Sequence, residues 1–351
     1  MNRSLYRFLR RRGATHSEID NAVNGGYLAL LVLDREVMPG AREFTTAQLA
    51  AQAGTDLETA HTVWRAIGFP ELPDDLAVFT AADVKALKAL INRTKSGSIF
   101  NWTLERALPQ VRVLSSSLAR AADTETDELA RSVAMAREAG FDDEQQAVLI
   151  AERFAFDEIA GLIDHAHRLQ LRAAIWRRLA GADPSTPGTV TGAVGFVDLV
   201  GYTALSQELE SEDIGALVAR FGELAHDTVV GAGGRIVKTI GDEVMYVTDT
   251  ANAAALIALR LTERSIGDEL LPETRAGLAY GSMLSREGDY YGPVVNLASR
   301  LTEIARPGEV LASRQLTDGI ARTAGVRTSR STTRRIRDIG RVEVIRLTRA
   351  G

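Results

Sequence analysis

The chain has 351 residues and a net charge of −5 at pH 7, with 45% hydrophobic and 25% charged residues. This balance is typical of a folded globular protein and excludes a largely disordered chain. Cysteine is absent, which excludes disulfides, thiolate nucleophiles and cysteine-held metals, and fits a cytoplasmic location. The longest early apolar run, Tyr27–Leu33, is far shorter than the ~20 residues of a membrane span, so none is expected. At about 150 residues per domain, the length favours two domains.

The first domain is expected to be all-helical and to cover residues 1–180. Its apolar residues recur at helical spacing, as in Leu28, Leu31 and Val32. The segment Thr80–Asp83 has the pattern of a capping box and predicts a helix start. Strand-like alternation is scarce in this half of the chain.

A short segment rich in proline and glycine, at residues 181–189, separates two textures of sequence. It holds Pro184 and Pro187 between Gly181 and Gly188. Proline and glycine together stop helices and favour extended or turn conformations. We predict a linker here, followed by a second domain over residues 190–351.

The second domain is predicted to alternate strands and helices. The order strand–helix–strand–strand–helix–strand is that of the ferredoxin-like fold, βαββαβ, so the whole chain is assigned to the α+β class. The expected elements are a strand at 190–197, a helix at 212–230, a hairpin at 235–247, a helix at 250–262, a strand at 274–285, a helix at 294–304, and short strands at 308–312 and 343–347.

Two aspartates of this domain are candidates for metal binding. Asp198 follows the first strand, and Asp242 lies in the Gly241-Asp242 turn of the hairpin. In a split βαβ sheet these strands are neighbours, so both carboxylates can meet at one sheet edge. Hard divalent cations prefer such oxygen ligands, and two ions can clamp the oxygens of a phosphoryl displacement. The alternative is that each aspartate only caps a helix or fills a turn.

A second pair of candidates lies on the helix predicted at 294–304. Asn296 and Arg300 are four residues apart and therefore share one helix face. An arginine in this position can hold two phosphoryl oxygens, and an amide can orient a sugar ring. The alternative is an exposed helix arginine paired with a nearby carboxylate.

Three segments together resemble the signature blocks of the class III nucleotidyl cyclases: Phe196–Thr203 (FVDLVGYT), Val237–Val244 (VKTIGDEV) and Asp289–Arg300 (DYYGPVVNLASR). They occur in the family's order. The helical first half resembles the regulatory half of the pH-sensing adenylyl cyclases of mycobacteria. The resemblance implies a ferredoxin-like cyclase domain that follows a helical regulatory domain.

The resemblance also implies roles for particular residues. Asp198 and Asp242 match the ligands of two Mg²⁺ or Mn²⁺ ions per active site, and Asn296 and Arg300 match the residues that stabilise the transition state. Lys238 and Asp289 match the pair that reads adenine. A lysine donor and an aspartate acceptor do complement adenine and leave guanine with unmatched polar groups. The alternative interpretation of Lys238 is an exposed lysine on a strand, without a role in binding.

The basic residues expected on the triphosphate depart from the family pattern. Ser282 stands where animal members have an arginine after the glycine, which here is Gly281. The C-terminal lysine of the family is replaced by arginines in Arg334–Arg337, of which we nominate Arg337. The alternative is a solvated basic turn.

The implied reaction is the cyclisation of ATP to 3′,5′-cyclic AMP and pyrophosphate in a head-to-tail homodimer. The metal ligands of one chain would face the adenine-reading and transition-state residues of the other. One alternative is a guanine-specific or catalytically silent signalling module. Another is a diguanylate cyclase. The segment Ile240–Glu243 superficially resembles the signature loop of that enzyme class, although the loop's second glycine is missing here.

Two features of the first domain bear on regulation and partners. His165 and His167 lie on a predicted helix just before the linker. Histidine is the side chain that ordinarily changes its charge near physiological pH, so this pair is a candidate for a pH switch; the alternative is two surface histidines without a role. Segments within residues 44–87 resemble a winged helix–turn–helix. The helix in recognition position carries His61 and Arg65 but little other positive charge, so nucleic acid is not an expected partner.

Overall fold

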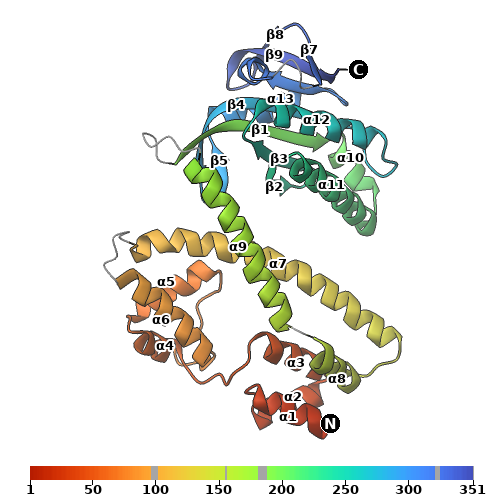
Figure 1. Ribbon diagram of the computed structural model, residues 1–351. Helices are drawn as coiled ribbons and strands as arrows, with labels where there is room; N and C mark the ends of the chain where they lie inside the picture. The colour runs from red at the N-terminus through yellow and green to blue at the C-terminus, as the bar shows by residue number, and fades with distance from the viewer. Residues whose placement is uncertain (96–101, 155, 181–187, 321–324, 351) are drawn as a thin grey trace. The chain divides into compact units, whose positions relative to one another are not determined.

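The structure is a computed structural model, and it divides into two compact units, Met1–Arg177 and Arg178–Gly351 (Figure 1). The described residues are 1–95, 102–154, 156–180, 188–320 and 325–350. Most of the linker predicted at 181–189 lies outside them, so the predicted domain limits remain a prediction. Among the helices of these ranges, none is long and apolar enough to cross a membrane.

The described part of the first unit is built from helices, as the sequence predicts (Figure 1). Phe44 and Phe79 form an isolated β-bridge. The helices are α1 (Arg3–Arg11), α2 (His16–Gly25), α3 (Leu28–Val37), α4 (Thr46–Ala53), α5 (Leu57–Ile67), α6 (Ala81–Lys95), α7 (Leu104–Glu138), α8 (Asp143–Arg153) and α9 (Phe156–Ala180).

Side-chain caps fix where several of these helices begin. Thr15 and Glu18 form a reciprocal capping box at the start of α2. The predicted start of α6 is confirmed, because the backbone N–H of Thr80 donates to Asp83 Oδ2 at 2.7 Å. These caps satisfy backbone N–H groups that have no partner inside the helix.

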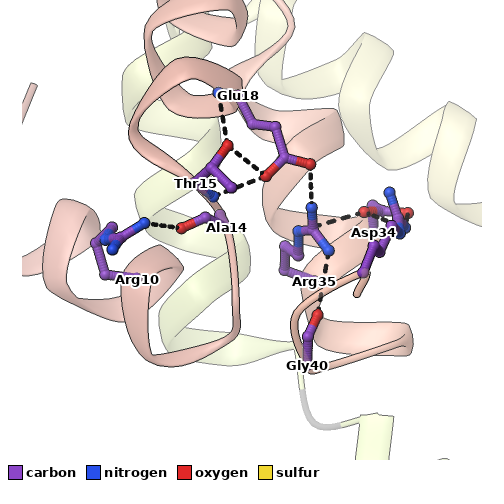
Figure 2. A network of polar contacts seen from close by, with 8 residues as sticks. Arg10, Ala14, Thr15, Glu18, Asp34, Arg35 and Gly40 are labelled. Carbon is purple, nitrogen blue, oxygen red and sulfur yellow. Dashed lines mark hydrogen bonds and ion pairs between the residues drawn. The ribbon is translucent and has the colours of Figure 1, made fainter. Parts of the chain in front are cut away.

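A buried arginine joins α2, α3 and the loop after α3. The side chain of Arg35 is 0% exposed. Its Nη2 donates to Glu18 Oε1 at 2.5 Å, its Nη1 donates to the carbonyl of Gly40 at 3.4 Å, and its Nε lies 3.7 Å from Asp34 Oδ2 (Figure 2). Two of its three nitrogens therefore donate hydrogen bonds, to α2 and to the loop after α3, which offsets part of the cost of burying the charge, whereas Nε makes no hydrogen bond.

The second unit is organised around one mixed sheet with the order β2-β3-β1-β4-β6-β9-β7, with β5 paired to β4 and β8 paired to β9. The part β2-β3-β1-β4 is antiparallel and has the ferredoxin-like order, so the predicted fold is confirmed. The strands are β1 (Thr189–Leu199), β2 (Arg235–Ile240), β3 (Glu243–Thr248), β4 (Thr274–Arg286), β5 (Asp289–Tyr291), β6 (Val310–Ser313), β7 (Val326–Thr328), β8 (Thr332–Ile336) and β9 (Gly340–Arg349).

Helices cover both faces of this sheet. Alternate residues of β1 point to opposite faces. Ala193 and Val197 pack in the core with α11 and α12, whereas Val194 and Phe196 pack in a separate core with α13. The helices of the unit are α10 (Tyr202–Glu208), α11 (Ser211–Gly231), α12 (Ala251–Ile266), α13 (Pro293–Ile304) and α14 (Arg314–Asp318).

Helix α13 lies unusually close to β4. A Cβ on Gly277 would come within 2.3 Å of the carbonyl oxygen of Ala298 and the backbone nitrogen of Thr302. The hydroxyl of Thr302 also donates to the carbonyl of Phe196 at 3.3 Å. Glycine at this strand position therefore allows the helix and the strand backbone to touch.

Candidate functional site

A row of charged side chains crosses three strands on the face of the sheet that α13 covers. Asp198 of β1 lies opposite Glu243 of β3 on one side and opposite Arg275 of β4 on the other. Asp198 shares the parity of Phe196, which places it on the α13 face. Asp198 was expected directly after its strand, but β1 continues to Leu199. The hydrogen-bonded register therefore holds this carboxylate between an acid and a base.

Asp242 joins this row from the turn between β2 and β3, as predicted. Gly241 has a φ of 60°, which lets the chain turn there. The backbone N–H of Leu199 donates to the carbonyl of Asp242 at 3.2 Å, which ties the turn to the end of β1. Burial and the negative charge of Asp198 raise the pKa of Asp242. The structure thus brings the two predicted metal ligands together.

Glu243 makes this end of the sheet still more acidic. Burial and the charges of Asp198, Asp242 and Glu303 raise the pKa of Glu243 to about 7. Burial is the main cause of both raised pKa values, and the charges of the neighbouring acids add to it, so a nearby positive charge would stabilise the ionised carboxylates. A bound cation would supply such a charge.

The donor set fits Mg²⁺ or Mn²⁺ held jointly with a substrate. Both predicted ligands, Asp198 and Asp242, offer carboxylate oxygens, the type of ligand these ions prefer. Within the described ranges, no cluster of three or more histidines or acids is arranged to hold a metal ion. A two-carboxylate site is completed by phosphate oxygens and water, which is how Mg²⁺ is commonly bound.

Arg275 is a member of this site that the sequence reasoning missed. Its Nε donates to Asp198 Oδ2 at 2.8 Å, and its Nη2 lies 2.7 Å from the same oxygen. Its Nη1 donates to the carbonyl of Glu303 at 3.1 Å. The signal that could have found Arg275 is its strand register, because it pairs directly with Asp198 across β1 and β4.

Lys238 and Asp289 are in direct contact, as expected for a pair that acts together. Lys238 Nζ lies 2.6 Å from Asp289 Oδ2. The exposed fractions of the two side chains are 39% and 24%. The contact joins β2 to β5.

Two local irregularities make this contact possible. A bulge between Ile236 and Lys238 shifts the register of β2, so that Lys238 pairs with Met245 of the α13 face. On the other side, Glu287 and Gly288, with φ angles of 53° and 84°, form the tight turn that folds β5 back onto β4. Without the bulge, strict alternation would turn Lys238 to the opposite face.

A second contact between β2 and β5 lies beside the first. Arg235 Nη2 donates to the hydroxyl of Tyr290 at 3.0 Å, and its guanidinium lies 5.4 Å from the centre of the same ring. The backbone N–H of Tyr290 donates to Asp289 Oδ1 at 2.8 Å. Tyr290 therefore links the carboxylate of Asp289 to a cation on β2.

Asn296 and Arg300 lie on α13 as predicted, with Asn296 exposed and Arg300 partly buried. Arg300 Nη1 donates to Glu303 Oε1, and its Nη2 lies 3.7 Å from Asp338 Oδ2. In this structure, Arg300 thus pairs with carboxylates. This is the alternative to phosphate binding that the sequence left open for this helix arginine. Arg337 is 86% exposed and lies 3.5 Å from the same Asp338.

The regulatory candidates lie on the surface of α9. His165 and His167 are both exposed. Their nearest charged neighbours on the helix are Asp164 and Arg168, which pair at 2.7 Å. A hydrogen bond from Arg168 is the main cause that lowers the pKa of Asp164.

The two basic residues of α5 in the helix–turn–helix-like segment are paired with acids. His61 Nε2 lies 3.0 Å from Asp74 Oδ1. Arg65 Nη1 donates to Glu71 Oε1. These pairs occupy the two residues of α5 that a phosphate backbone would otherwise attract.

Comparison with known families divides the chain in the same way as the fold. A family described as "Adenylate cyclase regulatory domain" matches residues 2–175. A family described as "Adenylate and Guanylate cyclase catalytic domain" matches residues 188–344. The second match contains all the site residues described above in the sheet unit.

Similar proteins share both parts. An adenylate cyclase of Glutamicibacter nicotianae is 36% identical, over 80% of this chain and 72% of its own length. An adenylate cyclase of Streptomyces coelicolor is also 36% identical, over 87% of this chain and 78% of its own. A pH-sensitive adenylate cyclase of Mycobacterium tuberculosis is 29% identical over 98% of this chain and 87% of its own.

Proposed function

Because this chain belongs to the adenylate cyclase family, we propose that its sheet unit converts ATP to 3′,5′-cyclic AMP and pyrophosphate with the help of two metal ions. The resemblance seen in the sequence is confirmed by both family matches and by relatives that are 36% identical. The observation that carries the mechanism is the meeting of Asp198 and Asp242 beside an acidic row.

Asp198 and Asp242 would hold Mg²⁺ or Mn²⁺. When bound, such ions make the ribose 3′-hydroxyl more acidic and compensate the charge that develops on the phosphates. The chain's own contribution is to keep both carboxylates on one edge, through the β1 register and the Gly241 turn. Burial on the α13 face strengthens the electrostatic attraction for the ions.

Lys238 and Asp289 would read the adenine ring. Their mutual contact at 2.6 Å keeps one donor and one acceptor together until the base arrives. Adenine offers an acceptor at N1 and a donor at its amine, which can replace both partners of the pair. Guanine presents the reverse pattern and would leave both polar groups unmatched. This difference favours ATP over GTP.

Asn296, Arg300 and Arg337 would act on the ribose and the phosphates. Arg300 and Arg337 share Asp338, so both guanidinium groups lie near one carboxylate that polyphosphate can replace. A phosphate group attracts arginine more strongly than one exposed carboxylate such as Asp338 does, because it offers more charge and more acceptors. Arg300 would then stabilise the charge on the α-phosphate.

A head-to-tail homodimer would complete each active site. In this arrangement Asp198 and Asp242 of one chain face Lys238, Asp289 and Arg300 of a second copy. The homodimer is supported by the fact that each chain carries both the proposed metal ligands and the proposed nucleotide-binding residues. Two equivalent sites per dimer follow from the two-fold symmetry, and a rotation of one chain would open both sites.

Product analysis tests the reaction. The full chain is incubated with Mn²⁺ and either ATP or GTP, and the products are separated by chromatography. We expect 3′,5′-cyclic AMP and pyrophosphate from ATP and far less product from GTP. Cyclic GMP as the main product would support the guanine-specific alternative, and no cyclic product from either nucleotide would support the silent module.

Mixing two inactive variants tests the shared site. Asp198→Ala removes a metal ligand, and Arg300→Ala removes a transition-state residue. A mixed dimer keeps one intact site, formed by Asp198 of one chain and Arg300 of the other. We expect each variant alone to be inactive and the mixture to recover activity. A mixture as inactive as its components would overturn the shared site.

The helical unit is proposed to regulate catalysis, with His165 and His167 as proton-sensitive groups. The similarity to a pH-sensitive cyclase supports this role. Asp164 and Arg168 flank the histidines on α9 and pair with each other, so protonation of the histidines would change the charge balance of this helix surface. The test replaces both histidines with glutamine. An unchanged pH–activity profile would exclude this role.

A further inference from the structure

Arg275 grips only one of the two oxygens of Asp198. Both its Nε and its Nη2 are within 2.8 Å of Oδ2. Such a grip fixes the torsion angle of the carboxylate, because two donors on a planar fork define its direction. Arg275 therefore orients a candidate metal ligand without using all its oxygens.

The third donor of Arg275 reaches the end of α13. It binds the carbonyl of Glu303, one of the last four carbonyls of a helix that ends at Ile304. Such carbonyls have no donor inside the helix and carry partial negative charge. The side chain of Glu303 in turn accepts a hydrogen bond from Arg300. One arginine thus stands between the metal-binding carboxylate and the residue expected on the α-phosphate.

We propose that Arg275 is a positioning residue that directs Asp198 toward the metal and, through the end of α13, sets the position of Arg300. The proposal rests on the proposed function, since it assumes that Asp198 binds metal and that Arg300 meets the phosphate. Arg275 itself touches neither the metal nor the nucleotide. It acts through the two groups that do.

Two effects of opposite sign compete when Arg275 is replaced. Loss of a positive charge next to Asp198 favours cation binding, whereas loss of the grip frees the carboxylate to rotate. Groups that orient metal-binding carboxylates typically contribute about 10–100-fold in metal affinity. The side chain of Arg275 is 30% exposed, so solvent screens its charge and weakens the first effect. We expect the loss of orientation to dominate.

The first experiment measures metal affinity directly. Mn²⁺ binding to the full chain, with a non-cyclisable ATP analogue present, is followed by electron paramagnetic resonance for wild type, Arg275→Gln and Arg275→Lys. We expect about 10-fold weaker binding in Arg275→Gln. Arg275→Lys keeps the charge but not the fork, and we expect it to be weakened as well. Unchanged or tighter binding in both variants would overturn the proposal.

A matched control separates orientation from general stability. Arg220 donates from its Nε to Asp268 Oδ2 at 2.9 Å, and Asp268 is 12% exposed, close to the 14% of Asp198. Arg220→Gln therefore breaks a similar pair in the same unit, away from the acidic row. We expect it to lower the melting temperature as much as Arg275→Gln does, with Mn²⁺ affinity unchanged. Equal loss of Mn²⁺ affinity in the control would show that the effect is only structural.

The second experiment separates the effect of Arg275 on Asp198 from its effect on the end of α13. It uses mixed dimers with one intact site. In these dimers Arg275→Gln is placed either in the chain that supplies Asp198 or in the chain that supplies Arg300. We expect the first placement to raise the Mn²⁺ concentration needed for half-maximal activity, and the second to lower kcat at saturating Mn²⁺. Identical effects of both placements would overturn the link to α13. Mixtures without activity before Arg275 is changed would contradict the shared site instead, and the binding experiment would still decide the effect of Arg275 on Asp198.

Discussion

Each unit of this chain contains a polar network centred on one arginine, and the two networks differ in charge balance. Arg35 in the helical unit is fully buried and contacts Glu18, Asp34 and the carbonyl of Gly40 (Figure 2). Arg275 in the sheet unit is partly exposed and faces a group of acids. Both arginines join separate segments of their unit.

The pKa of the neighbouring acids distinguishes the two networks. Burial alone would raise the pKa of Glu18, but the hydrogen bonds from Thr15 and the charge of Arg35 outweigh it, so the pKa is lowered. Burial and mutual repulsion instead raise the pKa of Asp242 and of Glu243. The first network stabilises its acid in the charged form, whereas the second does not. The first therefore stabilises the fold, and the second is the place where we propose that an external cation binds.

The largest expected effect separates function from stability at Asp242. Asp242→Asn removes a proposed metal ligand, and we expect cyclic AMP production with Mn²⁺ and ATP to fall by about 10³-fold. The same change removes a like-charge repulsion, so the metal-free protein should melt at an equal or higher temperature. Product formation and thermal unfolding without metal check both parts. A lower melting temperature would contradict the assigned charge imbalance.

The reverse pattern is expected at Glu18. Glu18→Gln leaves the buried Arg35 without its closest charged partner. We expect the helical unit to lose about 2 kcal/mol of stability. This loss is smaller than that for a fully buried ion pair, because the side chain of Glu18 is 36% exposed. Hydrogen exchange of α1, α2 and α3 in the full chain measures it. The control Glu58→Gln replaces an exposed acid and should cost less than about 0.5 kcal/mol.

The direction in which the pKa of Glu18 is shifted determines how the stability of this network depends on pH. Because the pKa of Glu18 is lower in the folded chain than its usual 4.5, its contribution is present above pH 4.5. This stabilising contribution is lost as the pH falls through the lowered pKa that Glu18 has in the folded chain. Protection of α2 from exchange should therefore decrease in this acidic range in wild type and decrease less in Glu18→Gln. Equal acid sensitivity of both proteins would show that Glu18 does not stabilise this unit through its charge.

A third effect concerns selection of the base. Lys238→Gln removes the charged donor that faces Asp289, and we expect the ratio of kcat/KM for ATP over GTP to fall by about 10²-fold. Steady-state kinetics with both nucleotides measure the ratio. Lys88→Gln on the exposed surface of α6 is the control and should leave the ratio unchanged. An unchanged ratio in Lys238→Gln would remove this lysine from base recognition.

Much of this arrangement could be predicted from the sequence, because it depends on local patterns. Apolar spacing and turn residues are sufficient to predict the strand order around β1, and that order alone implies that Asp198 lies beside Asp242. The length of α12 was underestimated: the helix extends past Thr262 to Ile266. Helix ends are the part of a pattern that tertiary packing most readily changes.

The rest depends on register, which the sequence does not show. Arg275 and Glu243 belong to the site only because each pairs with Asp198 across neighbouring strands. The bulge that turns Lys238 toward the α13 face and the short hairpin of β5 were also not predicted. A one-residue change of register moves a side chain to the other face, so such contacts require the paired sheet.

The smallest expected effect tests the support that β5 gives to Asp289. Tyr290→Phe removes only the hydroxyl that accepts a hydrogen bond from Arg235, and it keeps the ring under the guanidinium. A single such hydrogen bond contributes about 1 kcal/mol, so we expect the KM for ATP to rise roughly 3–5-fold with kcat little changed. A fall in kcat alone would mean that Tyr290 affects the chemical step and not the position of the base.

The neighbouring tyrosine provides the control for this change. Tyr291 follows Tyr290 on β5, is 49% exposed, and by strand alternation points to the other side of the hairpin. Tyr291→Phe should therefore leave the KM for ATP at its wild-type value. If both variants raise the KM equally, the effect comes from the stability of the hairpin as a whole. If only Tyr290→Phe does so, the contact with Arg235 holds Asp289 where the base is read.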